Sequence, residues 1–468
     1  MKLFGLNRLA GLLLAATIAG APIAAPAFAQ DATPAPAAAA AAPAAAPAAA
    51  EAPAPVAAAP AAAEAPAPAA AAPAAPAEEA KPWAPDSGDT AWMLTSTALV
   101  LLMTIPALGL FYGGMVRRKN VLATITQSFA ITALVTVIWM VLTYSLAFTT
   151  NADPGLNKYI GGFDRFLMNG LKMDVPHPLA GTIPESVFMM FQMTFAIITP
   201  ALIAGAFAER MKFSGMMLFM ALWSIVVYAP IAHWVWGGGF LGGAGVLDFA
   251  GGTVVHINAG VAGLVCALVL GKRKGYGTDN MAPHNLVLTM IGASMLWVGW
   301  FGFNAGSAVA SNALAGHKGS SLGFCSGIVA GLVAVTPAAG NSGPFGAIVL
   351  GAIASFVCFF AVSVVKPKLG YDDALDAFGV HGIGGMIGAI GTGIVYSSTL
   401  GGPSKPDFDM GHQLLVQFET VGTTIVWAAV GTAIAITVAR LVTGLRVSRE
   451  VEFEGLDIGE HGERAYNY

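Results

Sequence analysis

Long apolar stretches follow one another through most of the chain. From about residue 90 onward, stretches of some 20 mostly apolar residues recur, and each is long enough to cross the ~30 Å hydrocarbon core of a bilayer as a helix. Ten such spans are expected, at residues 91–114, 121–148, 185–208, 213–235, 251–271, 284–304, 320–338, 345–365, 376–397 and 412–442. The pattern predicts an all-α polytopic membrane protein.

Short basic clusters punctuate the spans. Residues 117–119, 210–212 and 272–274 carry Lys and Arg directly after the first, third and fifth spans. Because Lys and Arg concentrate in cytoplasmic loops, these loops are predicted to be cytoplasmic and the first span to begin outside.

The first 29 residues have the pattern of a secretory signal peptide. Lys2 and Arg8 precede an apolar stretch at 9–21, and Ala27-Phe28-Ala29 is a small-x-small cleavage signal. We expect residues 1–29 to be removed, which also places the mature N-terminus outside the cytoplasm.

A low-complexity segment separates this peptide from the spans. Residues 31–80 contain 32 Ala and 11 Pro, with five acidic residues and no basic one. Frequent proline breaks helices, and no side chain here is large enough to build a core. We therefore predict a disordered periplasmic linker over 30–87, with a spacer that reaches the cell wall or a partner as the alternative. A transmembrane domain over 88–443 and a cytoplasmic tail over 444–468 follow.

Composition narrows the class of protein. The chain of 468 residues is 56% hydrophobic and 10% charged, with a net charge of −4. An ordinary soluble enzyme carries about 25% charged residues, and a nucleic-acid-binding protein needs a basic surface. Cys266, Cys325 and Cys358 lie in apolar runs without metal-ligand spacing and are interpreted as small buried hydrophobes. No enzymatic activity, metal site, cofactor or nucleic-acid partner is expected.

Two histidines lie inside apolar spans. His256 and His381 have apolar or small neighbours and no adjacent carboxylate. Ionisable residues in membrane spans are costly and mark functional sites. Burial favours the neutral imidazole, which both donates and accepts a hydrogen bond. The alternative is two separate structural histidines, each bonded to a backbone carbonyl.

Each histidine follows an aspartate. Asp248 lies eight residues before His256, and Asp376 lies five before His381, where a loop becomes a helix. A carboxylate there can cap free N–H groups. Capping is the preferred interpretation for Asp376, whereas for Asp248 capping and remote support of a cation site both stay open.

Aromatic residues near the outer ends of spans form another group. It consists of Phe191 and Phe195, Trp236, and Phe303 with Ser307 four residues later. Aromatic faces attract cations by about 0.5–2 kcal/mol each, and a serine hydroxyl can accept from an N–H donor. An interfacial aromatic belt, which membrane proteins generally have, is the alternative.

Several long motifs carry a family resemblance. They are Phe111-Tyr-Gly-Gly-Met, Ala208-Glu-Arg, Pro230-Ile-Ala-His-Trp-Val-Trp-Gly-Gly-Gly, Leu247-Asp-Phe-Ala-Gly-Gly-Thr-Val-Val-His-Ile-Asn, Gly299-Trp-Phe-Gly-Phe-Asn-Ala-Gly-Ser and Asp376-Ala-Phe-Gly-Val-His-Gly. In this order they closely resemble the ammonium transporter (Amt/Mep/Rh) family, of the bacterial Amt type, over residues 88–468.

The resemblance implies an ammonium transporter-like bundle built from inverted repeats. It implies a homotrimer with one hydrophobic pore in each subunit. It also implies roles for individual residues: ammonium recruitment by Trp236, Ser307 and Phe191 with support from Asp248, a pore gate of Phe195 and Phe303, and a pore lined by His256 and His381.

The implied activity is transport of ammonium and methylammonium across the bacterial inner membrane. Recruited ammonium would pass as ammonia, with or without its proton. A trimeric PII-type regulatory protein would dock on the cytoplasmic face. The alternatives are an ammonium sensor with little flux and, less favoured, a membrane haem protein that uses the two histidines as ligands.

One departure from the family is evident. The family has eleven spans, whereas ten are found here. Only 17 residues separate Ser307 from Cys325, where the family places its seventh helix. If the later spans keep the family orientation, residues 308–319 must cross the membrane as a non-helical segment. A member with impaired transport is therefore a further alternative.

Overall fold

A computed structural model describes residues 83–305, 307 and 321–466. The expected signal peptide at 1–29, nearly all of the expected linker at 30–87 and the expected crossing at 308–319 lie outside the described residues.

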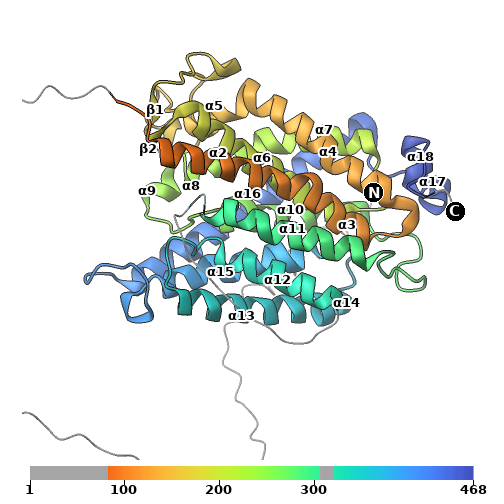
Figure 1. Cartoon of the computed structure of the whole chain (residues 1–468). Helices are drawn as coiled ribbons and strands as arrows, with labels where there is room; N and C mark the ends of the chain where they lie inside the picture. Colours follow the sequence, from red (N-terminus) through yellow and green to blue (C-terminus); the bar gives the residue numbers. More distant parts are fainter. Residues whose placement is uncertain (1–82, 306, 308–320, 467–468) are drawn as a thin grey trace, which may run out of the picture. The chain divides into compact units, whose positions relative to one another are not determined.

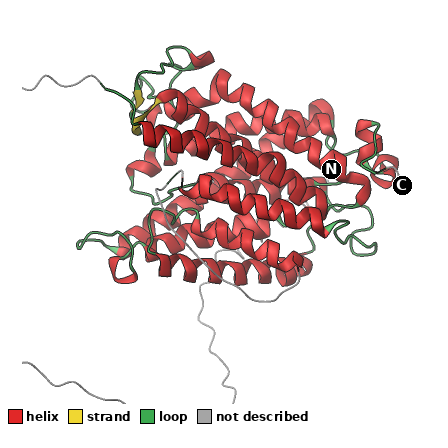
Figure 2. Ribbon diagram, viewed as in Figure 1, coloured by secondary structure: helices red, strands yellow, loops and turns green. Residues whose placement is uncertain are grey.

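The described part is mostly helical (Figures 1 and 2). Its first half contains α2 (Ser87–Leu102), η1 (Met103–Leu108), α3 (Gly109–Met115), η2 (Arg118–Asn120), α4 (Val121–Ile138), η3 (Trp139–Thr143), α5 (Tyr144–Phe148), η4 (Leu156–Lys158), η5 (Phe166–Met168), β1 (Pro176–His177), β2 (Ala180–Pro184), α6 (Glu185–Phe207), α7 (Phe213–Trp223), η6 (Ser224–Tyr228), α8 (Ala229–Val235), α9 (Phe240–Gly243), η7 (Gly252–Ile257) and α10 (Asn258–Leu270). Its second half contains α11 (Leu286–Ala305), α12 (Ser321–Val335), α13 (Pro344–Phe360), η8 (Ala361–Val365), α14 (Lys366–Leu369), η9 (Phe378–Gly382), α15 (Ile383–Val395), η10 (Ser398–Leu400), α16 (Met410–Thr443), α17 (Arg449–Glu454) and α18 (Leu456–His461).

Consecutive helices join into membrane-length segments. Within the described residues, nine segments are long and apolar enough to span a bilayer. They run over Ser87–Met115, Arg118–Phe148, Glu185–Phe207, Phe213–Gly243, Gly252–Leu270, Leu286–Ala305, Pro344–Leu369, Phe378–Val395 and Met410–Thr443. The prediction of an all-α polytopic membrane protein is confirmed.

The stretch expected as a span at 320–338 forms a shorter helix. The helix α12 has 15 residues and ends at Val335. Pro337, two residues later, has no N–H to continue the hydrogen-bond ladder. Hydropathy alone therefore placed the end of this helix three residues too late.

The two predicted pore histidines lie on π-helical turns at the starts of spans. His256 belongs to η7 and His381 to η9. These turns approach each other closely, because a Cβ atom on Gly260 would overlap the backbone of Gly382. Glycine at this crossing lets the two helices come near enough for both imidazoles to meet.

A short hairpin holds the start of the described body at one end. β1 and β2 pair antiparallel. The Trp83 indole donates to the carbonyl oxygen of Gly181 at 2.7 Å, and the Asp86 N–H donates to that of Thr182 at 2.8 Å. The residues that precede α2 are therefore fixed to the loop that precedes α6.

The described C-terminal tail is packed against the opposite end of the bundle. The Asp457 carboxylate accepts from the N–H of Ala123 at 2.8 Å, in the first turn of α4. The Glu460 carboxylate accepts from the N–H of Phe213, the first residue of α7, also at 2.8 Å. The described tail therefore caps two spans and is not free in solvent.

Candidate functional site

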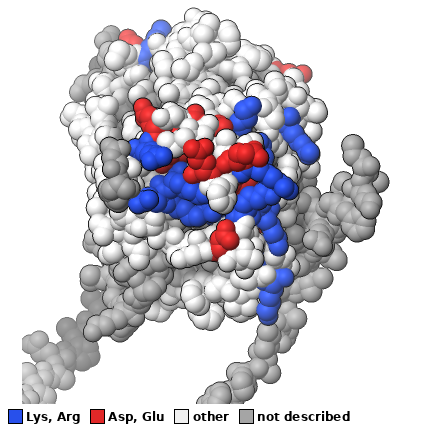
Figure 3. Space-filling view, turned by 90° about the vertical axis from the view of Figure 1, so that its right-hand side faces the viewer, with Lys and Arg blue, Asp and Glu red and all other residues white. Residues whose placement is uncertain are grey.

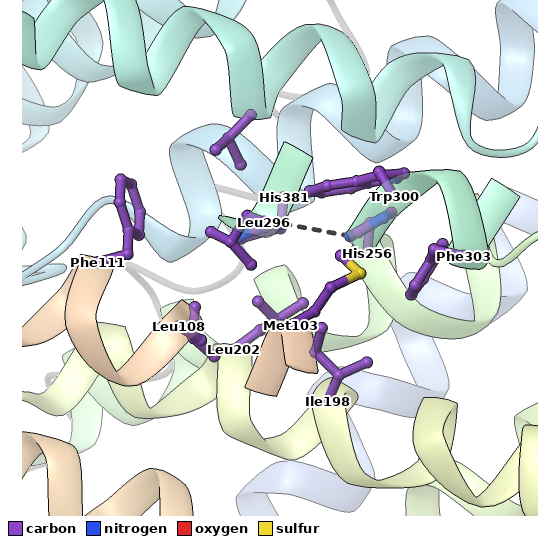
Figure 4. A pocket seen from close by; sticks show the side chains of 11 residues that line it. Met103, Leu108, Phe111, Ile198, Leu202, His256, Leu296, Trp300, Phe303 and His381 are labelled. Atoms are coloured by element: carbon purple, nitrogen blue, oxygen red, sulfur yellow. Dashed lines mark hydrogen bonds between the residues drawn. The ribbon is translucent and has the colours of Figure 1, made fainter. Parts of the chain in front are cut away.

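A narrow cavity lies between the two halves of the bundle (Figure 4). Its lining is apolar apart from two imidazoles and an indole N–H. The lining residues are Met103, Leu108, Phe111, Ile198, Leu202, His256, Leu296, Trp300, Phe303, Val329 and His381. The Trp300 N–H is already bonded to the Thr336 hydroxyl at 3.0 Å. Among the described lining residues, the histidines are therefore the polar groups available to a guest.

The two imidazoles contact each other. The Nδ1 atoms of His256 and His381 are 3.2 Å apart although the residues are 125 positions apart in sequence. Their rings are nearly parallel, with centroids separated by 5.2 Å. His256 also lies nearly parallel to the Trp300 ring, at 5.8 Å between centroids. This packing fixes the orientation of the His256 ring in the cavity wall.

The contact between the Nδ1 atoms sets the hydrogen-bonding capacity of the pair. In a pair of neutral imidazoles, one Nδ1 donates and the other accepts. The donor ring then has an Nε2 that accepts, and its partner has an Nε2 that donates. The Nε2 atom of His256 is buried and has no hydrogen-bond partner within the described part of the chain. The pair can therefore offer an acceptor and a donor to a small polar guest.

A stack of phenyl rings closes one end of the cavity. Phe195 on α6 and Phe303 on α11 have ring centroids 4.4 Å apart with an angle of 37° between planes. Both side chains are fully buried. A guest that enters from this end must displace at least one of the rings.

Trp236 and Phe191 continue this aromatic group away from the cavity. The Trp236 ring meets Phe195 edge-on at 5.8 Å, and the Phe191 ring meets Phe195 at 5.0 Å. Trp236 is only half-buried. Phe195 therefore connects the outer rings to the ring that borders the cavity.

Asp248 makes two kinds of contact, and its carboxylate has the capping role that the sequence left open. Its carboxylate accepts hydrogen bonds from the N–H groups of residues 251–254, at 2.6–3.1 Å. Its backbone carbonyl accepts from the Trp236 indole at 2.8 Å. Burial raises the pKa of this carboxyl group, and the four N–H donors oppose that rise. Asp248 thus caps the turn that carries His256 and also holds Trp236.

Ser307 lies two residues beyond the end of α11. Its hydroxyl donates to the carbonyl oxygen of Phe303 at 2.8 Å, so the lone pairs of its oxygen can still accept from a cation.

Comparison with known proteins identifies the family. The sequence profile of the Ammonium Transporter Family matches residues 91–318 and 312–466. An ammonium transporter from Aquifex aeolicus is 47% identical over 411 residues, which cover 82% of this chain and 94% of that protein.

The chain belongs to the ammonium transporter family. Solved structures of the family agree with this fold. Mep2 from Saccharomyces cerevisiae is 32% identical, with a TM-score of 0.69, and the match covers 78% of this chain and 88% of Mep2. A protein described as a sensor Amt protein is 26% identical, with a TM-score of 0.70 over 80% of this chain and 98% of that one. This chain is therefore a multi-pass membrane protein with the ammonium transporter fold.

Asp376 does not cap the helix that carries His381, contrary to the sequence-based interpretation. The cap is Asp373, whose carboxylate accepts from the N–H groups of Ala377 and Phe378 at 3.1 and 2.8 Å. Asp376 forms an ion pair with Lys366 instead. A φ of +60° at Asp376 turns the backbone between the two aspartates. The spacing of eight residues between Asp248 and His256 was the signal that could have selected Asp373.

A buried ion cluster joins the loops at the end that carries the C-terminal tail. The Arg273 guanidinium donates to Asp372 at 2.8–3.2 Å and to Glu209 at 3.0 Å. Glu209 also accepts from the backbone and side chain of Arg117 at 2.7 and 3.0 Å. Burial opposes ionisation of Glu209, but Arg273 and Arg117 outweigh it and lower the pKa of this carboxyl group. In the sequence these residues stand out only as parts of basic loops or of a family motif, and their charges meet only in the fold.

Proposed function

We propose that this protein transports ammonium by recruiting the cation at the outer aromatic group and conducting ammonia, with or without its proton, past His256 and His381. The observation that carries the proposal is the apolar cavity in which two imidazoles in mutual contact supply the available hydrogen-bonding groups.

Such a cavity suits ammonia better than a metal cation. Ammonium and potassium are similar in size, but only ammonium can lose a proton and donate directional hydrogen bonds. A cation that enters an apolar cavity loses its hydration at a large cost, whereas neutral ammonia loses far less. The His256–His381 pair can accept from ammonia and donate to it, and it offers a path for the released proton.

Recruitment is assigned to the group outside the phenyl stack. Trp236 and Phe191 provide aromatic faces for a cation, and the Ser307 oxygen provides an acceptor. Asp248 supports this site through its carbonyl contact with the Trp236 indole. Phe195 and Phe303 act as the gate between this site and the cavity.

Purified protein in liposomes tests the function. Methylammonium uptake, or an ammonium-driven flux, is expected at rates well above those of empty liposomes and without a comparable potassium flux. Saturable ammonium binding without flux would instead support the sensor or transport-impaired alternative. Absence of both binding and flux from folded protein would contradict the proposal.

Orientation and partners complete the proposal. Lys and Arg gather at the end of the bundle that carries α17 and α18 (Figure 3), as the positive-inside rule expects of a cytoplasmic face. The N-terminus would then be periplasmic and the protein would lie in the bacterial inner membrane. A homotrimer and a PII-type partner docked on this basic face agree with the family, and the packed tail offers that partner a structured surface.

A further inference from the structure

His233 is a buried histidine outside the cavity, in the last turn of α8 and three residues before Trp236. Its side chain is fully buried. The Nδ1 atom lies 3.0 Å from the carbonyl oxygen of Ala147, and the Nε2 atom lies 2.7 Å from that of Asn157. One side chain therefore joins α8 to the end of α5 and to the outer loop that contains η4.

Both partners of this imidazole can only accept hydrogen bonds. A neutral imidazole donates to one carbonyl at a time, and imidazolium donates to both. Ala147 lies in the last turn of its helical segment, where carbonyl oxygens lack helical partners and attract donors. His177 is another buried histidine near the same end of α5, but only one of its ring nitrogens faces a carbonyl oxygen. Its Nε2 lies 3.0 Å from the Phe148 carbonyl oxygen, while its Nδ1 accepts from the N–H of Leu179.

The backbone of His233 also organises the chain that follows Trp236. Its carbonyl oxygen accepts from the N–H groups of Gly237 and Gly239 at 3.0 and 2.9 Å. A Cβ atom on Gly237 would overlap the Ala147 carbonyl oxygen, so this turn is pressed against the end of α5. Trp236 is therefore held between the His233 contacts on one side and the Asp248 carbonyl, which its indole binds, on the other.

We propose that His233 is a positioning residue for ammonium recruitment, which holds the end of α8 against α5 and the outer loop so that Trp236 presents its ring in a fixed orientation. The inference rests on the proposed function, because it requires Trp236 to contact the cation. A ring that is fixed before the cation arrives loses less conformational freedom on binding. Loss of the His233 contacts should therefore weaken apparent affinity more than it slows maximal transport.

A double-mutant cycle on methylammonium uptake in proteoliposomes tests this role. His233→Phe keeps a ring of similar size and removes both ring nitrogens, and with them every hydrogen bond from this side chain to the two carbonyl oxygens. It is expected to raise KM about three- to tenfold and to change the maximal rate less than about twofold. In a Trp236→Leu background the same change is expected to have no further effect on KM, because coupled residues are not additive. His233→Gln, which keeps one donor group, is expected to give a smaller rise and replaces the Phe variant if that variant does not fold.

His177→Phe is the matched control. It removes a hydrogen bond to the same end of α5 without touching the Trp236 segment, so it should lower thermal stability and leave KM unchanged. A rise in KM with Trp236→Leu but none with His233→Phe or His233→Gln would overturn the inference and leave the proposed function intact. Equal effects of the His233 change in both Trp236 backgrounds would also overturn it. An unchanged KM in Trp236→Leu would instead contradict the recruitment site itself.

Discussion

Asp248 and Asp373 occupy equivalent positions, each capping a π-helical turn with a carboxylate eight residues before a cavity histidine. Asp248 receives four backbone N–H groups and Asp373 receives two. A carboxylate at a helix start complements both the unpaired N–H groups and the helix dipole. The turns that carry the two cavity imidazoles are therefore stabilised in the same way, each by an aspartate cap at the start of its span.

Asp373 should make stability depend on pH. Burial raises its pKa to about 6, with Lys366 opposing the rise and Asp376 adding to it. The folded state then holds a proton that the unfolded state has released, so stability contributed by this group falls as pH rises from about 4 to about 6. We expect the melting temperature of detergent-purified Asp373→Asn to rise relative to that of the unaltered protein as the pH increases from 4.5 to 7.5. Thermal unfolding of both proteins across this pH range measures the difference.

The neighbouring Asp372 provides the control for this pH series. Burial favours its neutral form, but Arg273 outweighs burial and lowers the pKa of the carboxyl group. Its stabilising effect is present above the unfolded pKa of about 4 and is lost only at lower pH. Asp372→Asn should therefore cost the same stability throughout pH 4.5 to 7.5. A parallel pH dependence in both variants would contradict the assignment.

The sequence predicted the spans well because apolar length is a local property. Only the family resemblance placed His256 and His381 in one pore, since nothing local in the sequence brings together residues 125 positions apart. The cap at Asp373 was missed because Asp376 lies nearer the helix start in sequence. Only the positive φ at Asp376 turns its side chain to Lys366. His233 lies within one of the family motifs. The two carbonyl oxygens that its ring contacts belong to segments far away in the sequence, so its role cannot be inferred from the motif alone.

Replacing either cavity histidine should alter conduction and leave the fold in place. His256→Ala or His381→Ala removes one of two hydrogen-bonding partners from an otherwise apolar lining, so we expect ammonium flux or ammonium/potassium selectivity to change by about tenfold or more. Flux assays in proteoliposomes together with thermal unfolding measure both effects. His412→Ala, at an exposed histidine on α16, should change neither. Full flux and selectivity in both cavity variants would remove the histidines from the mechanism.

The buried ion cluster should be sensitive to the loss of a single charge. Glu209→Gln leaves Arg273 and Arg117 with one fewer negative partner in a buried site, and we expect a loss of about 3–5 kcal/mol in the free energy of unfolding. Glu463→Gln, at an exposed position in the tail, should stay within about 0.5 kcal/mol. Denaturant titration of both variants measures the free energy of unfolding. Equal losses in the two variants would show that the buried cluster contributes no more to stability than an exposed charge.

Docking of a PII-type protein should depend on exposed residues of the tail. Truncation after Val447 would also remove the caps that Asp457 and Glu460 supply to α4 and α7, so it cannot separate docking from stability. Arg449→Glu reverses a charge at an exposed position. We expect this variant to keep its melting temperature and to retain less of a cognate PII protein in pull-down. Undiminished binding by both Arg449→Glu and the truncated chain would place the docking surface elsewhere.

Cysteine labelling in intact cells should reveal which end of the bundle faces the cytoplasm. The native cysteines at 266, 325 and 358 are buried, so an introduced thiol can be read against a low background. Lys172→Cys lies at an exposed position in the loop that precedes the hairpin, and Ser448→Cys at an exposed position in the tail. An impermeant maleimide should modify the first variant in intact cells and the second only after the membrane is permeabilised. Arg446 pairs with Glu452 and donates to the Leu270 carbonyl at 2.9 Å, which holds the tail at the basic end. Modification of Ser448→Cys in intact cells would therefore contradict the proposed cytoplasmic location of the basic end. It would also exclude the docking of a cytoplasmic partner at that end.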